Sequence, residues 1–436
     1  MSPLKIAFFT TFIDLLGFGI IIPIQPFYAK SFGVSATIVT LLGASYSLMQ
    51  FLFSSSIGRL SDRVGRRPVL LGCVSLIVVG YVLFGLAESV TMLFIARMIS
   101  GLGGANLGAT QAIIADVTSP EERSKGMGLI GAAFGLGFIL GPALGGALGQ
   151  HHATTPIFAA AGLAALNLLF IWRFLPETCA QAKATKEGEL SKESVSAEPH
   201  PPHTPRLKRL APLLASPNVR PLLGLALTFT LAFALMEQTI GLFIERVWVE
   251  GRGLSPAEQS QEASALTAYF LVLIGVAATI VQGGLIGKLT RRFGEARLAK
   301  VGVFFVLVSV AVIPLAGRAE SFITLLAVAL LMATGTGVLH PSRSSLISQS
   351  VPAELQGQAL GLNQSLAALG RVLGPAIAGY LFEQHHERPL WCAVGVLSLT
   401  LLLAQGIKQP STPSTSPLSG DELSLDEPSE VTSVAP

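Results

Sequence analysis

Residues 58–68 read Gly58-Arg-Leu-Ser-Asp62-Arg63-Val-Gly65-Arg66-Arg67-Pro68, a short basic segment between two long apolar runs. Residues 287–294 repeat this pattern as Gly287-Lys-Leu-Thr-Arg291-Arg-Phe-Gly294. A second pair of segments matches in the same way, Gly137-Phe-Ile-Leu-Gly141-Pro142 with Gly370-Arg371-Val-Leu-Gly374-Pro375. The offsets of the two pairs, 229 and 233 residues, are nearly equal, which indicates an internal duplication. Repeated halves are typical of transporters that place a substrate site between the halves.

The composition of the chain excludes most classes of soluble protein. Of its 436 residues 51% are hydrophobic and only 13% are charged, and the mean hydropathy is +0.62. A soluble chain carries roughly 25% charged residues, so this chain cannot coat a soluble surface. The net charge of +3 gives no reason to expect a nucleic-acid partner. The three cysteines, Cys73, Cys179 and Cys392, have no metal or disulfide spacing, so we expect no metal and no cofactor.

The apolar runs are long enough to cross a membrane, which takes about 20 residues each. In the first half they are 5–29, 38–57, 68–87, 91–115, 125–149 and 155–175. In the second half they are 219–245, 262–287, 298–316, 320–347, 356–383 and 389–408. The predicted fold class is therefore an all-α integral membrane protein with twelve transmembrane helices in two pseudo-symmetric six-helix bundles.

The domain organisation follows from these runs. We predict an N-terminal bundle over 1–175, a polar cytoplasmic linker over 176–217, a C-terminal bundle over 218–408 and a disordered tail over 409–436. Twenty-one of the 29 basic residues fall on the side of the predicted termini and linker, and five fall on the other side. The positive-inside rule then places both termini in the cytoplasm of a multi-pass protein of the cell membrane.

Residues 58–68 resemble the loop signature of the major facilitator superfamily. Three further segments are similar to superfamily motifs: Leu93-Phe-Ile-Ala-Arg97 of the fourth helix, Gly137 to Gly146 of the fifth, and Ile13-Asp14-Leu-Leu-Gly17 to Pro26 of the first. The last of these, with Ile114-Ala-Asp116-Val-Thr118, resembles tetracycline-resistance-type efflux proteins of the drug:proton antiporter branch. The resemblance implies the major facilitator fold and proton-coupled efflux of a small amphipathic organic compound or drug by alternating access.

The loop signature supplies a candidate cytoplasmic gate. Its residues are Gly58, Asp62, Arg63, Gly65, Arg66, Arg67 and Asp116. We expect Asp62, Arg66 and Asp116 to form a charge network between the second and fourth spans that acts as a latch on the outward-facing state. The alternative is that the arginines only set the topology. The second copy of the loop signature has Arg291 in place of Asp62. The resemblance therefore assigns the acidic residue that switches the gate to the first copy alone.

Charged residues inside spans are functional candidates by default. Asp14 and Glu237 are the candidate proton-coupling residues, because burial in a cavity favours the neutral form of a carboxyl group. By depth along the helices, Arg97 is expected to contact Glu237 near the outer gate. Arg371 is expected to face the cavity. The predicted polar wall comprises Gln25, Tyr46, Gln50, Gln111, Gln238, Asn363 and Gln364.

The fifth predicted span carries four glycines and a proline at close spacing. Small residues lie on one face of this helix, which fits either tight packing or a role in proton coupling. The residues of the motif are Gly137, Gly141, Pro142, Gly145 and Gly146.

Two alternative functions are considered. One is a facilitator or symporter of an organic anion, sugar or lipid-like solute, and the other, of a different class, is a non-transporting receptor or scaffold. We expect no enzymatic activity, and we expect a monomer whose partners are a small molecule, protons and the lipid bilayer.

Overall fold

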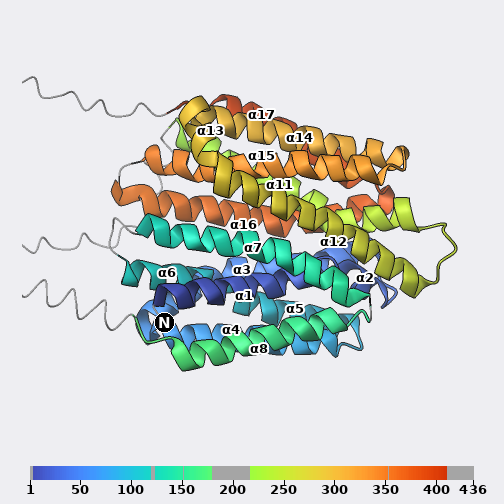
Figure 1. The fold of residues 1–436 in the computed structure, drawn as a ribbon, viewed down its shortest axis with the longest axis horizontal. Helices are drawn as coiled ribbons and strands as arrows, with labels where there is room; N and C mark the ends of the chain where they lie inside the picture. Colours follow the sequence, from blue (N-terminus) through green and yellow to red (C-terminus); the bar gives the residue numbers. More distant parts are fainter. Residues whose placement is uncertain (1–2, 119–122, 151, 179–216, 352, 410–436) are drawn as a thin grey trace, which may run out of the picture.

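The computed structural model describes residues 3–118, 123–150, 152–178, 217–351 and 353–409, with no side-chain detail for most of 123–134 and 353–358. Cys179, almost all of the predicted linker and all but the first residue of the predicted tail lie outside these ranges. Figure 1 shows the described residues as long helices that run along one axis.

The helices of each half follow one another through short connections. The first half contains α1 (Pro3–Ile21), α2 (Gln25–Lys30), α3 (Ala36–Val64), α4 (Arg66–Gly85), α5 (Val90–Gly103), the 3₁₀ turn η1 (Gly104–Asn106), α6 (Leu107–Val117), α7 (Arg123–Gly149) and α8 (Thr155–Phe174). The second half contains α11 (Val219–Ile244), the π-helical η2 (Glu245–Val249), α12 (Pro256–Ile280), the π-helical η3 (Val281–Leu285), α13 (Ile286–Phe293), α14 (Glu295–Arg318), α15 (Phe322–Gln349), α16 (Ala353–Gln384) and α17 (Arg388–Gln405).

Twelve membrane spans can be followed through the described residues. Eleven helical stretches there are long and apolar enough to cross a membrane. The twelfth is α7, whose described side chains include the apolar segment Gly135–Gly149. The prediction of an all-α membrane protein with twelve spans is therefore confirmed.

Two spans differ in detail from the prediction. The run 5–29 is split into α1 and α2 at Pro23, because proline lacks an N–H group and disfavours helix at the preceding residue. The run 91–115 is interrupted by η1, where Gly103 and Gly104 precede Asn106. This second break positions a residue of the candidate site.

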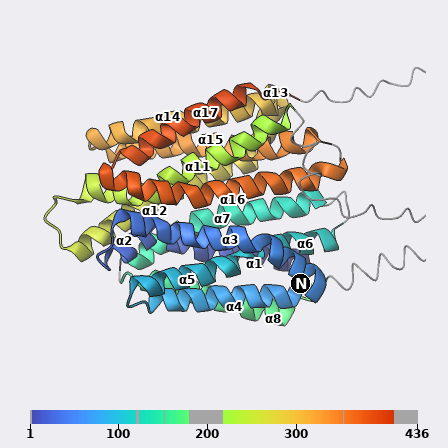
Figure 2. The same cartoon turned by 180° about the vertical axis from the view of Figure 1, so that it is seen from behind.

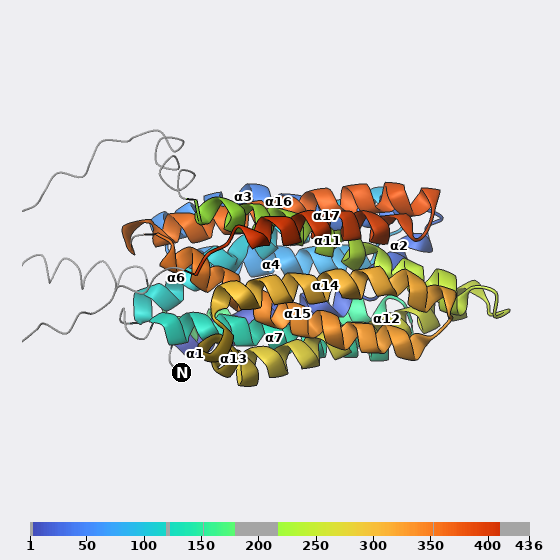
Figure 3. The ribbon, with the colours of Figure 1, turned by 90° about the horizontal axis from the view of Figure 1, so that it is seen from above.

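The two halves repeat one pattern of helix packing. In the first half α1 packs against α7 and α4 against α5; in the second half α11 packs against α16 and α14 against α15. The halves meet where α3 packs against α16 and α7 against α12. In Figures 1 and 2 α7 and α16 accordingly run through the middle of the molecule, and Figure 3 shows the same helices from above. Pseudo-symmetry of the two bundles follows from these matching pairs.

The glycines of α7 let it approach α1 backbone to backbone. A Cβ atom on Gly141 would lie 2.6 Å from the Cα atom of Gly19, and one on Gly145 would lie 2.4 Å from the carbonyl oxygen of Ile20. Gly137 faces α1 in the same way, whereas Gly146 faces Ala268 of α12. These contacts support tight packing for the four glycines, and Pro142 is buried beside Gly19. A role of this motif in proton coupling stays a prediction.

Replacing Gly141 by leucine is expected to lower the thermal unfolding temperature of the purified protein in detergent. The new side chain would meet backbone atoms of α1, which cannot move aside, and such overpacking costs about 1–3 kcal/mol or more. Gly162→Leu on α8 is the matched control, because a Cβ there meets open space. An equal unfolding temperature for the two variants would contradict the packing account.

The two ends of the bundle differ in how the halves meet. We name them the Lys30 end, which holds α2, and the Arg66 end, where α4 begins. At the Lys30 end the Nζ of Lys30 lies 2.8 Å from Oε2 of Glu245, and the backbone N–H of Thr37 donates to Oε1 of Glu383 at 2.9 Å. Both contacts join the two halves. Toward the Arg66 end, a Cβ on Gly58, Gly283 or Gly361 would meet no atom within 4 Å.

Candidate functional site

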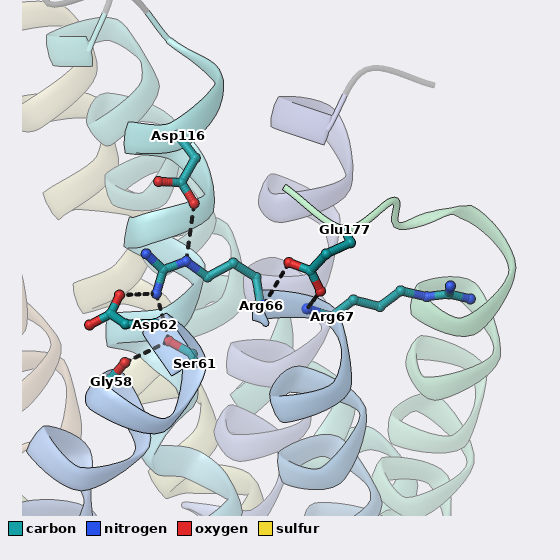
Figure 4. A network of polar contacts seen from close by, with 7 residues as sticks. All are labelled: Gly58, Ser61, Asp62, Arg66, Arg67, Asp116 and Glu177. Atoms are coloured by element: carbon teal, nitrogen blue, oxygen red, sulfur yellow. Dashed lines mark hydrogen bonds and ion pairs between the residues drawn. The ribbon is translucent and has the colours of Figure 1, made fainter. Parts of the chain in front are cut away.

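The predicted charge network at the Arg66 end is present, and it centres on Arg66 (Figure 4). The guanidinium of Arg66 contacts Oδ1 of Asp62 at 2.5 Å through Nη1 and Oδ2 of Asp116 at 3.0 Å through Nε. Nη1 also donates to the hydroxyl of Ser61 at 2.7 Å. Arg66 is buried, whereas the Asp62 side chain is 60% exposed. The network therefore ties together α3, α4 and α6, all in the first half.

Glu177 is a further member of this network, and it was not predicted from the sequence. Its carboxylate accepts the backbone N–H groups of Arg66 at 2.8 Å and Arg67 at 3.1 Å, at the first turn of α4 (Figure 4). Free N–H groups and the helix dipole both favour an anion at such a position. Gly65 is required here, because its φ is +115° and a Cβ would lie 2.5 Å from the Glu177 carboxylate. No pattern in the sequence indicates that residue 177 contacts residue 66.

The other residues of the loop signature have separate contacts. Arg67 donates to the carbonyl oxygen of Trp172 at 2.5 Å, and the carbonyl of Gly58 accepts the Ser61 hydroxyl at 2.8 Å. Arg63 is exposed. Only Asp62, Arg66 and Asp116 of the predicted gate are thus brought together as charged partners.

The second half repeats two of these contacts with the charge of the central residue inverted. Glu295 follows Gly294 as Arg66 follows Gly65, and its Oε1 accepts the hydroxyl of Ser345 at 2.5 Å. Glu295 and Ser345 each stand 229 residues after Arg66 and Asp116. The side-chain oxygen of Gln409 accepts the N–H of Ala296 at 3.0 Å, as Glu177 does in the first half. The offset read from the sequence therefore also relates the structural roles.

Asp14 is held by two asparagine side chains from different helices. Its Oδ2 accepts Nδ2 of Asn106 at 2.7 Å, and its Oδ1 accepts Nδ2 of Asn167 at 2.9 Å. Asn106 lies in η1 and Asn167 in α8, and both are buried. Asp14 itself keeps partial solvent access. Neither asparagine was predicted, since an amide within an apolar run has no distinctive sequence pattern.

Arg97 packs against aromatic rings. Its guanidinium carbon lies 4.6 Å from the centroid of the Tyr46 ring and 5.9 Å from that of Phe84. Arg97 is 4% exposed, and its Nε and Nη1 have no hydrogen-bond partner among the described residues. Gly104 of η1 lies against the Tyr46 hydroxyl, and the Gly104 carbonyl accepts the Gln50 side chain at 2.9 Å. Tyr46 thereby lies between η1 and Arg97, and Gln50 joins α3 to η1.

The prediction that Arg97 contacts Glu237 is wrong for this conformation. No ion pair joins these two described residues; Glu237 instead interacts electrostatically with Arg371. Depth along a helix does not fix the direction in which a side chain points. Arg97 stands on α5, which packs on α3 and α4, whereas Glu237 stands on α11, which packs on α16, the helix that carries Arg371. Tyr46, whose ring packs against Arg97, stands on α3, and α3 also packs against α16 of the second half.

The remaining polar residues of the predicted wall are spread over both halves. Gln25 and Gln238 both approach Gly43, where the halves meet. Asn363 is 3% exposed, and its Oδ1 has no hydrogen-bond partner in the described part of the chain. Gln111 is half-buried, and Gln364 is exposed. Gln25 and Gln238 therefore lie together, and for Gln111, Asn363 and Gln364 a place in the wall stays a prediction.

Comparisons with known proteins agree on one family. The family model described as Major Facilitator Superfamily matches residues 7–375 and 305–426. The chain is 32% identical to the class E tetracycline resistance protein of Escherichia coli, over 90% of this chain and 92% of that protein. It is 28% identical to multidrug resistance protein 1 of Bacillus subtilis, over 92% and 95%. The crystal structure of the human organic anion transporter MFSD10 is 25% identical and superimposes with a TM-score of 0.63, covering 92% of this chain and 98% of that one.

Proposed function

Because this chain belongs to the Major Facilitator Superfamily, we propose that it exports small amphipathic organic compounds in exchange for protons, by alternating access. Relatives named for tetracycline and multidrug resistance support a drug-like solute. The observation that carries the proposal is a carboxyl group on the first helix of each half, Asp14 on α1 and Glu237 on α11. Both stand within membrane spans and are only partly buried, and ionisable groups in such positions are functional candidates by default.

The loop network is proposed as the cytoplasmic gate. The distribution of basic residues supports a cytoplasmic position for the Arg66 end and for both termini. The contacts at the Lys30 end then join the two halves on the side that is proposed to face outward. The Arg66 network lies within the first half in this conformation, and its role as a latch on the outward-facing state stays a prediction.

The four predicted domains and the monomeric state belong to the same proposal. The bundles 1–175 and 218–408 are proposed to move as the two units of alternating access, with 176–217 connecting them and 409–436 following the second. A single chain holds both carboxyl groups and both halves of the cavity wall, so transport needs no second copy.

Uptake by inside-out membrane vesicles tests the proposed function. Vesicles that contain the protein and are acidified inside are expected to accumulate tetracycline or ethidium, because protons leaving the lumen drive the solute in. An ionophore that collapses the pH gradient is expected to abolish the accumulation. Vesicles without the protein are the control. Accumulation that persists without the gradient would contradict proton coupling.

Transport of an organic anion is a second candidate function. Arg97 and Arg343 are 4% and 5% exposed, and in each the Nε and Nη1 atoms have no hydrogen-bond partner among the described residues. Buried cations without partners favour an anionic ligand. The similarity to the human organic anion transporter supports the same substrate class. Competition of anionic, neutral and cationic compounds for uptake in the same vesicles distinguishes the two candidates.

A further inference from the structure

Asn106 and Asn167 supply one hydrogen bond to each oxygen of a carboxylate inside the membrane. The distances from their Nδ2 atoms to Oδ2 and Oδ1 of Asp14 are 2.7 and 2.9 Å. The Nδ2 of Asn167 also donates to the carbonyl oxygen of Thr10, one turn earlier on α1, at 3.3 Å. We infer that Asn106 and Asn167 are positioning residues that let Asp14 gain and lose a proton within the bundle. This inference rests on the proposed function, in which Asp14 carries the proton.

The inference follows from what each form of Asp14 needs. An ionised carboxylate only accepts hydrogen bonds, and the two amides donate to it. A protonated carboxyl group also donates one, and it needs an acceptor within reach. The Oδ1 atom of Asn167 is buried and has no hydrogen-bond partner in the described part of the chain. Rotation of this amide exchanges Nδ2 and Oδ1, so the same side chain serves both forms of Asp14.

The surroundings of Asp14 contain no competing cation among the described contacts. The titratable groups that interact with Asp14 are Tyr46 of α3 and Cys73 and Tyr81 of α4. The segment of α7 with described side chains, 135–149, contains no titratable residue. From α8 and η1 the neighbours are Asn167 and Asn106 themselves. The two amides are thus the partners that decide how Asp14 exchanges its proton.

Infrared difference spectroscopy tests the inference without any solute. The carboxyl band of Asp14 is identified as the band lost in Asp14→Asn, and its growth is followed as the pH is lowered. Asn167→Leu and Asn106→Leu remove a donor from the ionised form, so the midpoint of the band is expected to move by about 1–2 pH units to more alkaline pH. Ser309→Ala, which removes a buried hydroxyl in the other half, is the control and is expected to leave the midpoint unchanged.

A variant that keeps hydrogen bonding guards against loss of folding. Asn167→Ser retains a group that both donates and accepts, and it is expected to shift the midpoint less than Asn167→Leu does. An unchanged midpoint in both leucine variants, or equal shifts in the serine and leucine variants of Asn167, would overturn the inference. If the proposed function alone is wrong, a different set of results is expected. The band of Asp14 would then titrate and respond to the variants, while tetracycline and ethidium would move without protons.

Discussion

Replacing Asp14 by asparagine is expected to reduce pH-driven accumulation of solute to the level of vesicles without the protein. The substitution preserves shape and removes the only carboxyl group on α1. The new amide can still pair with Asn106 and Asn167, because each of these can present either its oxygen or its nitrogen. The variant should therefore fold and bind solute while losing its coupling to protons.

Solute binding and solute exchange by Asp14→Asn are compared with its proton-driven accumulation. Asp14→Asn is expected to retain binding of tetracycline and downhill exchange of labelled for unlabelled solute, both measured in the same vesicles. Glu250→Gln is the matched control, because this exposed carboxylate at the Lys30 end pairs only locally with Arg246. Full accumulation by Asp14→Asn would remove Asp14 from the coupling mechanism.

Replacing Arg66 by glutamine is expected to lower the rate of transport about tenfold, because a bias of about 1.4 kcal/mol between conformations corresponds to a tenfold change in their populations. Arg66 contacts Asp62, Asp116 and Ser61, and these contacts hold three helices together. Its loss leaves Asp116 without its described cation. Asp116 is only partly buried, so the loss is expected to be near the lower end of the roughly 1–3 kcal/mol that an acceptor left without its partner costs, about 1 kcal/mol, and a lower unfolding temperature is also expected.

Two neighbouring substitutions separate gating from topology and from stability. Asp62→Asn removes an exposed member of the network and is expected to lower transport without lowering the amount of folded protein in the membrane. Arg59→Gln removes an exposed arginine of the same segment, whose side chain contacts only serines of its own helix, and is expected to preserve transport. Equal transport by all three variants would leave the arginines with a role in topology alone.

The parts of the site that sequence could predict are those set by spacing along one chain segment. Asp62 and Arg66 stand four residues apart, and their pairing follows from that spacing once α3 and α4 are placed. The 229-residue offset likewise relates Arg66 to Glu295 and Asp116 to Ser345. Twelve spans follow from the lengths of the apolar runs.

Contacts that depend on the rotation of a helix could not be predicted in this way. Depth counts placed Arg97 beside Glu237, whereas α5 turns Arg97 toward Tyr46. Asn106 and Asn167 are 61 residues apart, and both reach Asp14 only because tertiary packing brings η1 and α8 to this residue. Glu177 reaches the first turn of α4 across more than a hundred residues. Tertiary packing, which leaves no periodic signal in the sequence, decides each of these contacts.

The release of protons on addition of solute tests the central claim most directly. Sealed inside-out vesicles that contain the protein are acidified inside, and the external pH is recorded in weak buffer when tetracycline or ethidium is added. The account predicts a solute-dependent release of protons from the native protein and none from Asp14→Asn. Solute that enters the native vesicles with no accompanying release of protons would contradict the proposed exchange.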